Sequence, residues 1–309
     1  MRFLVTGANG QDGIYLVSSL KMAGHEVVEV GRSRSKFFRF GQLVYGESPK
    51  LEDPNAAGEF LNSQRPDFIL HFAAVHYPAM LQGGESNQDR MFACHVTATK
   101  NLLDWMVGRK NSKMVVALSS QMYSTKDENL VIHEESDHNP VTFYGKTKSE
   151  AHNLVRRYSD KYQVNASGAI FFNHTSIRSK ANFLFPILAK SISDSIKNDF
   201  QDVRIKNSNS YLDIGCSDEY CEGVLSMLQE DRLTDYIFSS GQALKISLIV
   251  EEALLKMGHQ GKVKLLSESV ETNWCLVGDN TKAQNNLFWR PQKSASEILV
   301  NMIHNADAQ

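Results

Sequence analysis

The chain has 309 residues, a length that suits one large α/β domain or such a domain with a smaller appended lobe. Apolar residues make up 42% of it and charged residues 22%, a composition typical of globular rather than disordered proteins. The 33 basic and 35 acidic side chains give a net charge of -2, without the basic excess that nucleic-acid-binding proteins usually carry. No apolar run approaches the roughly 18 residues that span a bilayer. We therefore expect neither a nucleic-acid nor a membrane partner.

Cysteine usage and the start of the sequence favour a reducing compartment. The first residues lack the basic and apolar regions of a signal peptide. The cysteines form no Cys-x-x-Cys pair, and we expect free thiols that pack as small apolar side chains. They are Cys94, Cys216, Cys221 and Cys275. The histidines show no ligand spacing with cysteines or carboxylates, so no metal is expected. Cytoplasmic localisation is the resulting expectation.

Strand and helix patterns alternate through the first half of the chain. In chain order we predict a strand over 2–6, a helix that follows Gly13 and closes at Gly24, a strand over 26–30, a polar connection, a strand over 67–72, a helix over 90–108, a strand over 113–118, a helix over 144–162 and a strand over 165–172. Most of the strands are continuously apolar, as strands buried on both faces are. The alternation predicts an α/β fold, a doubly wound parallel sheet of the Rossmann type.

Beyond residue 172 the pattern becomes more mixed. Several helices with weaker strand signals indicate a smaller, substrate-binding lobe over 173–309. One segment, 235–239, is apolar enough to return to the main sheet as a strand. The predicted organisation is therefore a main domain over 1–172 followed by this lobe.

Three glycines lie between the first strand and the first helix: Gly7, Gly10 and Gly13. A tight turn favours glycine at the first position, close approach of a pyrophosphate at the second, and close helix-on-strand packing at the third. The helix N-terminus then presents N–H groups and a partial positive charge to phosphates. At the first strand-to-helix turn of an α/β chain, the motif predicts a dinucleotide site. A plain glycine turn is the alternative.

The end of the second strand bears on which dinucleotide is bound. A site for NAD usually places a carboxylate there, which accepts from the ribose 2′-hydroxyl. Here Arg32 and Ser33 stand at that end, and Glu29 lies inside the strand. Because a guanidinium pairs well with a 2′-phosphate, we predict that residues 1–172 bind NADP(H), with Arg32 as the main contact. The alternative is that Arg32 is a solvated surface charge.

A tyrosine and a lysine lie four residues apart at the start of the helix over 144–162. Tyr144 and Lys148 therefore share one helix face. An ammonium near a phenol stabilises the phenolate, so we expect the pKa of Tyr144 to be lowered toward working pH. Such a tyrosine can give or take the proton of a carbinol during hydride transfer. Ser119 ends the preceding strand, where its hydroxyl can bond the same substrate oxygen.

In these motifs the chain resembles the extended short-chain dehydrogenase/reductase family, and within it the GDP-mannose 4,6-dehydratase branch. The matching segments are the phosphate loop over 6–13, Ala73-Ala74, the Tyr-x-x-x-Lys pair over 144–148, Phe172-Asn173-His174, and the segments 278–283 and 289–291. The resemblance implies an enzyme that modifies a nucleotide-activated sugar. It also implies that Gln11, Asp12 and Ala73 line the cofactor, and that Asn173 and Arg178 anchor the substrate. Family members usually form dimers or tetramers, so a homodimer or homotetramer is expected.

One departure from the branch falls among the predicted catalytic residues. The dehydratases carry a glutamate that removes the C5 proton and assists loss of the 6-hydroxyl, and the matching residue here is Gln121. A neutral amide cannot act as a general base. The serine, tyrosine and lysine still suffice for hydride transfer at C4, as in the related 4-keto reductases. The alternative is that water or another acid, such as Glu134 or Glu135, replaces the missing base.

Other departures concern the nucleotide and one helix. Leu212 stands where the branch has an arginine that meets the diphosphate, and an arginine expected near 266–271 is absent. The resemblance therefore leaves GDP as the nucleotide in doubt. His95 stands where the family often has asparagine, and we expect a hydrogen-bonded buried side chain there rather than a catalyst.

Three functional hypotheses remain. The first is NADP(H)-dependent hydride transfer at C4 of a nucleotide-activated hexose, with Gln121 favouring a 4-keto reductase. The second is a true nucleotide-sugar 4,6-dehydratase, a lyase that returns the hydride to C6. The third is a non-catalytic NADP-binding regulatory or scaffold protein, against which the joint presence of Ser119, Tyr144 and Lys148 argues.

Overall fold

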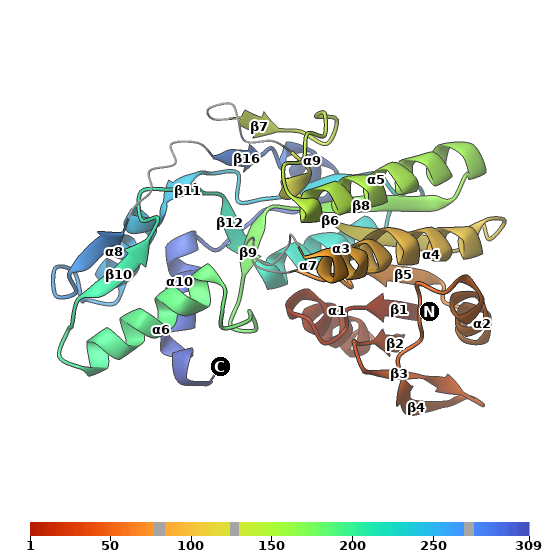
Figure 1. Cartoon of the computed structure of the whole chain (residues 1–309), viewed down its shortest axis with the longest axis horizontal. Helices are drawn as coiled ribbons and strands as arrows, with labels where there is room; N and C mark the ends of the chain where they lie inside the picture. The colour runs from red at the N-terminus through yellow and green to blue at the C-terminus, as the bar shows by residue number, and fades with distance from the viewer. Residues whose placement is uncertain (77–83, 124–129, 269–274, 309) are drawn as a thin grey trace. The chain divides into compact units, whose positions relative to one another are not determined.

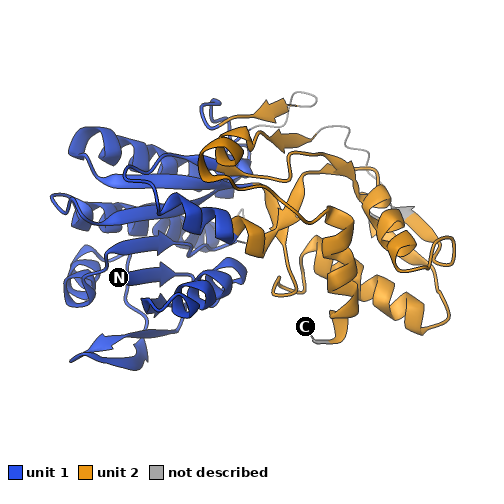
Figure 2. Ribbon diagram, turned by 180° about the vertical axis from the view of Figure 1, so that it is seen from behind, with its two compact units in different colours: residues 1–124, 134–171, 221–236 blue, residues 125–133, 172–220, 237–309 orange. Residues whose placement is uncertain are grey.

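The computed structural model describes residues 1–76, 84–123, 130–268 and 275–308. The chain divides into two compact units, coloured separately in Figure 2. The first unit comprises 1–124, 134–171 and 221–236, and the second comprises 125–133, 172–220 and 237–309. Within the described ranges, no helix is long and apolar enough to cross a membrane.

The first unit is built on an eight-stranded sheet whose central strands run parallel (Figure 1). Its strands stand in the order β13 (Tyr236–Phe238), β8 (Asn165–Phe171), β6 (Lys113–Ser119), β5 (Phe68–His71), β1 (Arg2–Thr6), β2 (Glu26–Val30), β3 (Arg34–Arg39) and β4 (Gln42–Glu47). Strands β1, β5, β6 and β8 are buried along almost their whole length, as strands covered on both faces are. The five strands predicted in the first half of the chain are confirmed, and the segment 235–239 does contribute a strand to the main sheet.

The chain after β2 is not the polar connection that the sequence predicts. Residues 34–47 form an antiparallel hairpin, β3 and β4, which extends the sheet beyond β2. Its two-residue turn uses positive φ at Phe40 (50°) and Gly41 (78°), a geometry that matches the twist of the flanking strands. The Gln64 side chain accepts from the Phe38 N–H at 2.8 Å and donates to the Phe38 carbonyl at 2.9 Å. Contacts with a distant helix, rather than a local pattern, thus hold the hairpin.

Helices pack against this sheet in the first unit. They are α1 (Gln11–Met22), α2 (Pro54–Gln64), α3 (Glu85–Phe92), α4 (Ala98–Met106) and α5 (Phe143–Tyr162), with a π-helical turn (Ala93–Thr97) joining α3 to α4 and a 3₁₀ turn (Ser120–Met122) after β6. Helices α2, α4 and α5 pack side by side. The helices predicted over 90–108 and 144–162 are confirmed, although the former already begins at Glu85. Gly24 follows α1 with φ 79°, as its predicted capping role requires.

Residues 221–236 belong to the first unit, whereas the sequence predicts that the second lobe covers 173–309. Hydrogen bonds to the first residues of β6 and β8 explain the difference. The Lys113 ammonium donates to the Leu228 carbonyl at 3.3 Å, and the Asn165 amide donates to the Asp231 carbonyl at 2.8 Å. The segment is therefore tied to the sheet before β13 begins.

The second unit consists of helices and short strand pairs (Figure 2). It has its own apolar core. Helices α6 (Leu184–Lys197), α8 (Ile246–Lys256) and α10 (Ala295–His304) contribute to that core, and this unit also contains α9 (Thr281–Leu287) and a 3₁₀ turn (Ala306–Ala308). Helix α7 (Ser217–Met227) begins in residues of the second unit and ends in residues of the first. The strand pairs are β9 (Asn173–Thr175) with β12 (Ile214–Cys216), β10 (Val203–Lys206) with β15 (Leu265–Glu268), β16 (Leu276–Gly278) with β7 (Leu130–Ile132), and β11 (Tyr211–Leu212) with β14 (Leu244–Lys245). Ser294 caps α10 in a capping box with Glu297.

A polar network anchors α5 within the first unit. His152 bonds Asp235 through Nε2 at 2.7 Å and His138 through Nδ1 at 3.1 Å. Asp235 also accepts from the Arg156 guanidinium at 3.2 Å and from the Gly168 N–H at 2.7 Å. Burial alone would raise the pKa of Asp235, but these bonds and the neighbouring charges outweigh it and lower the pKa to about 2. Burial, followed by the charges of His152 and Arg156, lowers the pKa of His138 to about 4.

We predict that acid weakens the fold in part through this network. Both folded pKa values lie below the ordinary ones, about 3.9 for aspartate and about 6.5 for histidine, so the unfolded chain binds more protons on acidification. The contribution of His138 is therefore complete above about pH 6.5 and declines toward about pH 4. That of Asp235 is complete above about pH 4 and is lost as the pH falls through about 2.

Urea unfolding at several pH values measures this effect. Between about pH 6.5 and pH 4, the free energy of unfolding should fall less steeply for His138→Gln than for the wild type, because one titrating group is removed. His304→Gln, at the exposed end of α10, is the matched control and should keep the wild-type slope. Equal slopes for His138→Gln and the wild type would contradict the assignment.

Candidate active site

The turn between β1 and α1 requires glycine at two of its three glycine positions. Gly7 adopts φ 71°, and a Cβ there would lie 2.6 Å from the Phe72 carbonyl oxygen. A Cβ on Gly13 would lie 2.2 Å from the Gly7 carbonyl oxygen, so a larger residue would force α1 away from the turn. Gly10 is the N-cap of α1 and makes no side-chain capping bond. The turn can therefore present a helix N-terminus and backbone N–H groups to an anion.

The segment after β2 passes close to this turn. A Cβ on Gly31 would lie 2.5 Å from the side-chain amide nitrogen of Asn9, which belongs to the glycine turn. Arg32 and Ser33 follow Gly31 and are exposed. Arg32 is therefore exposed next to a residue that lies against the glycine turn, and sequence reasoning missed that Asn9 and Gly31 bring the two segments together.

Polar groups also gather at the end of β5 and in the first turn of α1. Thr6 and His71 are paired across β1 and β5, and the Thr6 hydroxyl bonds His71 Nδ1 at 2.8 Å. The Ala73 N–H donates to the same hydroxyl at 3.0 Å. The Gln11 amide donates to the Asp12 carboxylate at 3.2 Å. Sequence reasoning missed His71, the polar residue that ends β5, whereas Thr6 already belongs to the matching phosphate loop over 6–13.

Lys148 and Tyr144 lie at the start of α5. Thr142 caps this helix by accepting from the Gly145 N–H at 2.9 Å. Lys148 is only 3% exposed, and its ammonium donates to the Ala117 carbonyl of β6 at 2.8 Å. Burial lowers the pKa of Lys148 to about 8. A buried ammonium is thus held near the carboxyl end of β6, 5.7 Å from the centre of the Tyr144 ring.

The pKa of Tyr144 departs from the sequence expectation. The Tyr–Lys spacing predicts a lowered pKa, whereas burial raises it and the Asp12 carboxylate adds to the increase. A hydrogen bond with the Ser119 side chain opposes this shift without cancelling it. The predicted lowering is wrong for this structure, because the phenol is buried and burial outweighs the opposing effects. Tyr144 therefore keeps its proton at neutral pH.

Ser119 and Gln121 meet the N-terminus of α5. A Cβ on Gly145 would lie 2.0 Å from the Gln121 carbonyl oxygen, so the approach depends on glycine at this position. The Thr142 hydroxyl donates to the Gln121 side-chain oxygen at 3.0 Å, and the Gln121 N–H donates to the Ser119 hydroxyl at 3.2 Å. The structure thus brings all four predicted catalytic residues together within the first unit.

Two histidines flank the Tyr144 ring. The rings of His76 and His95 meet it edge-to-face, with centroids 4.9 Å and 5.3 Å away. Both ring nitrogens of His95 are hydrogen-bonded and the residue is 2% exposed, which confirms the predicted buried and satisfied histidine. The spacing of these histidines in the sequence carries no signal for this arrangement, which depends on the packing of α5 against the π-helical turn.

The two glutamates considered as alternative bases, Glu134 and Glu135, differ in exposure. Glu135 is 85% exposed and lies 3.8 Å from the Arg156 guanidinium, whereas Glu134 is buried.

All four cysteines are free thiols; three are buried as predicted and Cys94 is half-buried. Across the described ranges, no three His, Cys, Asp or Glu side chains are grouped to hold a metal ion.

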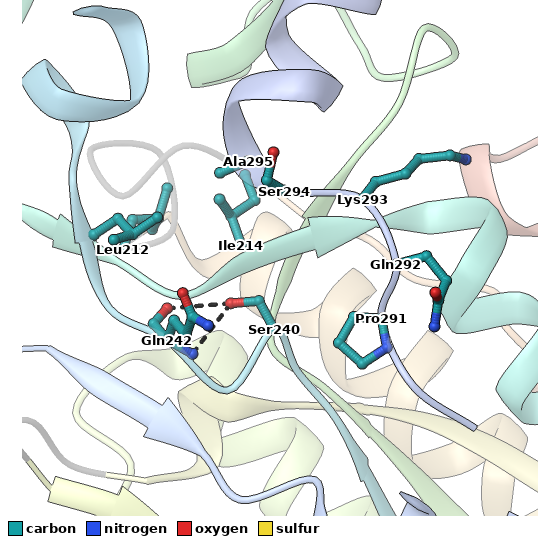
Figure 3. Close-up of a pocket in the computed structure, with 10 residues that line it drawn as sticks. Leu212, Ile214, Ser240, Gln242, Pro291, Gln292, Lys293, Ser294 and Ala295 are labelled. Carbon is teal, nitrogen blue, oxygen red and sulfur yellow. Dashed lines mark hydrogen bonds between the residues drawn. The ribbon is translucent and has the colours of Figure 1, made fainter. Parts of the chain in front are cut away.

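The predicted substrate anchors belong to the second unit. Asn173, on β9, is exposed and donates to the Asp213 carbonyl at 3.2 Å, and Arg178 is exposed beyond the same strand. Leu212 and Ile214 line a cavity of about 200 Å³ and contribute to its apolar wall (Figure 3). The other lining residues are Ser240, Gln242, Leu244, Pro291, Gln292, Lys293, Ser294 and Ala295.

Comparison with known sequences identifies relatives whose alignments cover almost the whole chain. The profile of the family described as GDP-mannose 4,6 dehydratase matches residues 4–302. The human protein named GDP-mannose 4,6 dehydratase is 27% identical over 344 aligned residues, which cover 97% of this chain and 90% of that protein. The GDP-mannose 4,6-dehydratase of Vibrio cholerae is 23% identical over 352 aligned residues, with 97% and 92% covered.

Solved structures share the fold. RMD from Pseudomonas aeruginosa, complexed with NADPH, has a TM-score of 0.81 at 20% identity, covering 99% of both chains. The dTDP-glucose 4,6-dehydratase from Bacillus anthracis, in complex with NAD, has a TM-score of 0.80 at 14% identity, covering 100% of this chain and 97% of that one. These similarities confirm the predicted Rossmann-type α/β fold. Because the family profile spans nearly its full length, the chain belongs to the GDP-mannose 4,6-dehydratase family of extended short-chain dehydrogenase/reductase enzymes.

Proposed function

We propose that the chain uses NADP(H) to transfer hydride at C4 of a nucleotide-activated hexose, acting as a 4-keto reductase. One observation carries the proposal: a buried ammonium, that of Lys148, lies one helical turn from Tyr144, whose phenol is bonded by Ser119. These are the groups that proton transfer to a sugar oxygen needs. Membership of a family named for GDP-mannose supports a nucleotide sugar as the substrate class.

The glycine turn fits a nicotinamide dinucleotide. Side chains larger than hydrogen are excluded at Gly7 and Gly13, and the N-cap of α1 makes no side-chain bond that would compete with a phosphate. The residues that would hold the cofactor are Gly7, Gly10, Gln11, Asp12, Gly13, Arg32, Ser33, Ala73, Tyr144 and Lys148. When bound, the cofactor supplies the hydride donor or acceptor.

The surroundings of Arg32 support NADP(H) over NAD(H). Arg32 is exposed and follows Gly31, which lies against Asn9 of the glycine turn, so its guanidinium can pair with a 2′-phosphate. The Glu29 carboxylate, which precedes it in β2, is paired with the Lys21 ammonium at 2.5 Å. A carboxylate engaged in this way is a weaker acceptor for a ribose hydroxyl and repels a phosphate less. Among the structural relatives, RMD from Pseudomonas aeruginosa is described with NADPH.

Tyr144 is proposed to move the proton. Because burial raises its pKa, the phenol is protonated at neutral pH and can donate to the oxygen of a C4 ketone. Ser119 can donate a second hydrogen bond to the same oxygen. With a pKa of about 8, Lys148 stays largely charged at neutral pH and stabilises the phenolate that proton transfer leaves behind. Proton donation is the direction that ketone reduction requires.

Gln121 supports reduction rather than dehydration. Its side-chain oxygen accepts from the Thr142 hydroxyl at 3.0 Å, and the neutral amide cannot remove a C5 proton. Family membership keeps a true 4,6-dehydratase as the second candidate. That activity would need another base, and the acids raised by the sequence are Glu134, which is buried, and Glu135, which is 85% exposed.

Product analysis separates the two candidates. A reductase consumes NADPH stoichiometrically with the 4-keto-6-deoxy derivatives of GDP-, UDP- or dTDP-hexoses, as absorbance and product mass would show. A dehydratase converts the parent nucleotide sugar to the 4-keto-6-deoxy product with no net change in NADPH. We expect Tyr144→Phe to lower kcat about 10²- to 10⁴-fold while NADPH binding is kept.

Tyr162→Phe is the matched control, since Tyr162 lies exposed at the far end of α5, and it should leave kcat unchanged. Undiminished turnover by Tyr144→Phe would contradict the proposed role of the phenol. NADPH binding without turnover of any of these sugars would favour a non-catalytic cofactor-binding protein.

Cofactor choice is tested by Arg32→Ala. We expect it to weaken NADPH binding about 10- to 100-fold and NADH binding hardly at all, because a charge-assisted hydrogen bond to the 2′-phosphate is lost. Arg39→Ala, at the exposed end of β3, serves as the control for loss of a surface charge. Fluorescence titration with both dinucleotides gives the two affinities, and equal losses for NADPH and NADH would remove the 2′-phosphate assignment.

Restoring a carboxylate tests the role of Gln121. Gln121→Glu would place a general base where Thr142 already donates a hydrogen bond, and we expect it to raise dehydration of a nucleotide hexose on the order of 10²-fold. Glu134→Gln and Glu135→Gln should not lower any dehydration seen in the wild type. Product mass spectrometry measures both; a wild-type dehydratase activity that either glutamate variant abolishes would show that the base is not missing.

A further inference from the structure

His95 sits where the helix between β5 and β6 widens into a π-helical turn, Ala93–Thr97. The Thr99 hydroxyl donates to the His95 carbonyl at 2.6 Å, so this carbonyl of the widened turn has a hydrogen-bond donor. Such turns interrupt α-helices frequently at functional sites, because they redirect a side chain. Here the redirected side chain is an imidazole that is 2% exposed.

Hydrogen bonds define the state of this imidazole. The Val75 N–H donates to Nε2 at 3.0 Å, so Nε2 carries a lone pair and the proton of the neutral ring is on Nδ1. Nδ1 lies 2.8 Å from the Thr147 hydroxyl and donates to it. That hydroxyl in turn donates to the Tyr144 carbonyl at 2.8 Å. A continuous chain of bonds therefore runs from the segment after β5 to the backbone of Tyr144.

The same ring also contacts the Tyr144 side chain. The two rings meet edge-to-face with their centroids 5.3 Å apart. Burial, followed by the charge of Lys148, lowers the pKa of His95 well below its ordinary value, so the ring stays neutral and Nε2 remains an acceptor. His95 thus makes two separable hydrogen bonds. One joins Nε2 to Val75, and the other joins Nδ1 to Thr147, which in turn bonds Tyr144.

We propose that His95 is a positioning residue that fixes the Tyr144 phenol, through Thr147 and the ring contact, relative to the chain segment that holds the cofactor. This inference rests on the proposed function, in which Tyr144 moves the proton and Ala73 lies beside the cofactor. Proton and hydride transfer depend on sub-ångström placement of the reacting groups. A neutral histidine bonded on both sides sets that placement without itself touching the substrate.

Two near-isosteric variants separate the attachments. In His95→Gln the amide oxygen reaches the position of Nε2, which keeps the bond from Val75 and loses the one to Thr147. In His95→Asn the amide nitrogen reaches the position of Nδ1, which keeps the bond to Thr147 and loses the one from Val75. We expect His95→Gln to lower kcat at least about tenfold while the Kd for NADPH rises less than about threefold.

His95→Asn should show the opposite split, raising the Kd for NADPH about 3- to 10-fold with a smaller effect on kcat. Thr147→Val should reproduce the kcat loss of His95→Gln, and the two changes should not add in the double variant. Thermal unfolding of each variant reports stability, and His304→Gln controls for replacing an exposed histidine. Parallel losses of kcat, NADPH affinity and stability in both His95 variants, or additive effects with Thr147→Val, would overturn the proposal.

Failure of the proposed function gives a different result. A wild type that turns over none of the nucleotide sugars rejects the function, whereas the geometry is still tested by NMR of ¹⁵N-histidine-labelled full-length protein. We expect the His95 resonances to report a neutral ring protonated on Nδ1 at neutral pH. A ring protonated on Nε2, or one that is charged at neutral pH, would overturn the inference whatever the activity.

Discussion

The close approach of α5 to the end of β6 determines the geometry of the site. It depends on Gly145, because a Cβ there would lie 2.0 Å from the Gln121 carbonyl oxygen. At this separation the Lys148 ammonium reaches a carbonyl of β6, and the Thr142 hydroxyl reaches the Gln121 side chain. The helix moves as a rigid body over this length, so any side chain at Gly145 would move Lys148 and Thr142 away from their partners together.

One buried positive charge organises the electrostatics around that approach. The Lys148 ammonium, second only to burial, lowers the pKa values of His71 and His95, so both imidazoles stay neutral beside it. Neutral rings can accept hydrogen bonds from the main chain, which protonated rings could not. The phenol of Tyr144 also stays uncharged in this low-dielectric setting, with the Asp12 carboxylate reinforcing its proton. In this site Lys148 carries the buried positive charge, and the Tyr144 phenol stays protonated.

Local patterns carry most of the fold but only part of the site. The apolar strands and the glycine turn are evident from the sequence, since strand burial and the steric limits at Gly7 and Gly13 are local properties. The hairpin after β2 escapes prediction because Gln64, from another element, bonds its backbone. The pKa of Tyr144 is mispredicted because spacing gives the distance to a charge and says nothing of burial. The hydrogen bonds of His95 depend on a π-helical turn that no periodicity in the sequence predicts.

The first unit is assembled from distant parts of the chain, and this has a consequence for biosynthesis. Residues 221–236 complete it, and Asp235 among them provides the carboxylate bonded by His152 and the Gly168 N–H. A ribosome releases α5 and β8 long before that carboxylate exists. Until it is translated, the imidazole and the amide lack their acceptor, and the nascent half remains incompletely folded. Maturation of the first unit is thereby delayed until part of the second unit, residues 172–220, has also been translated.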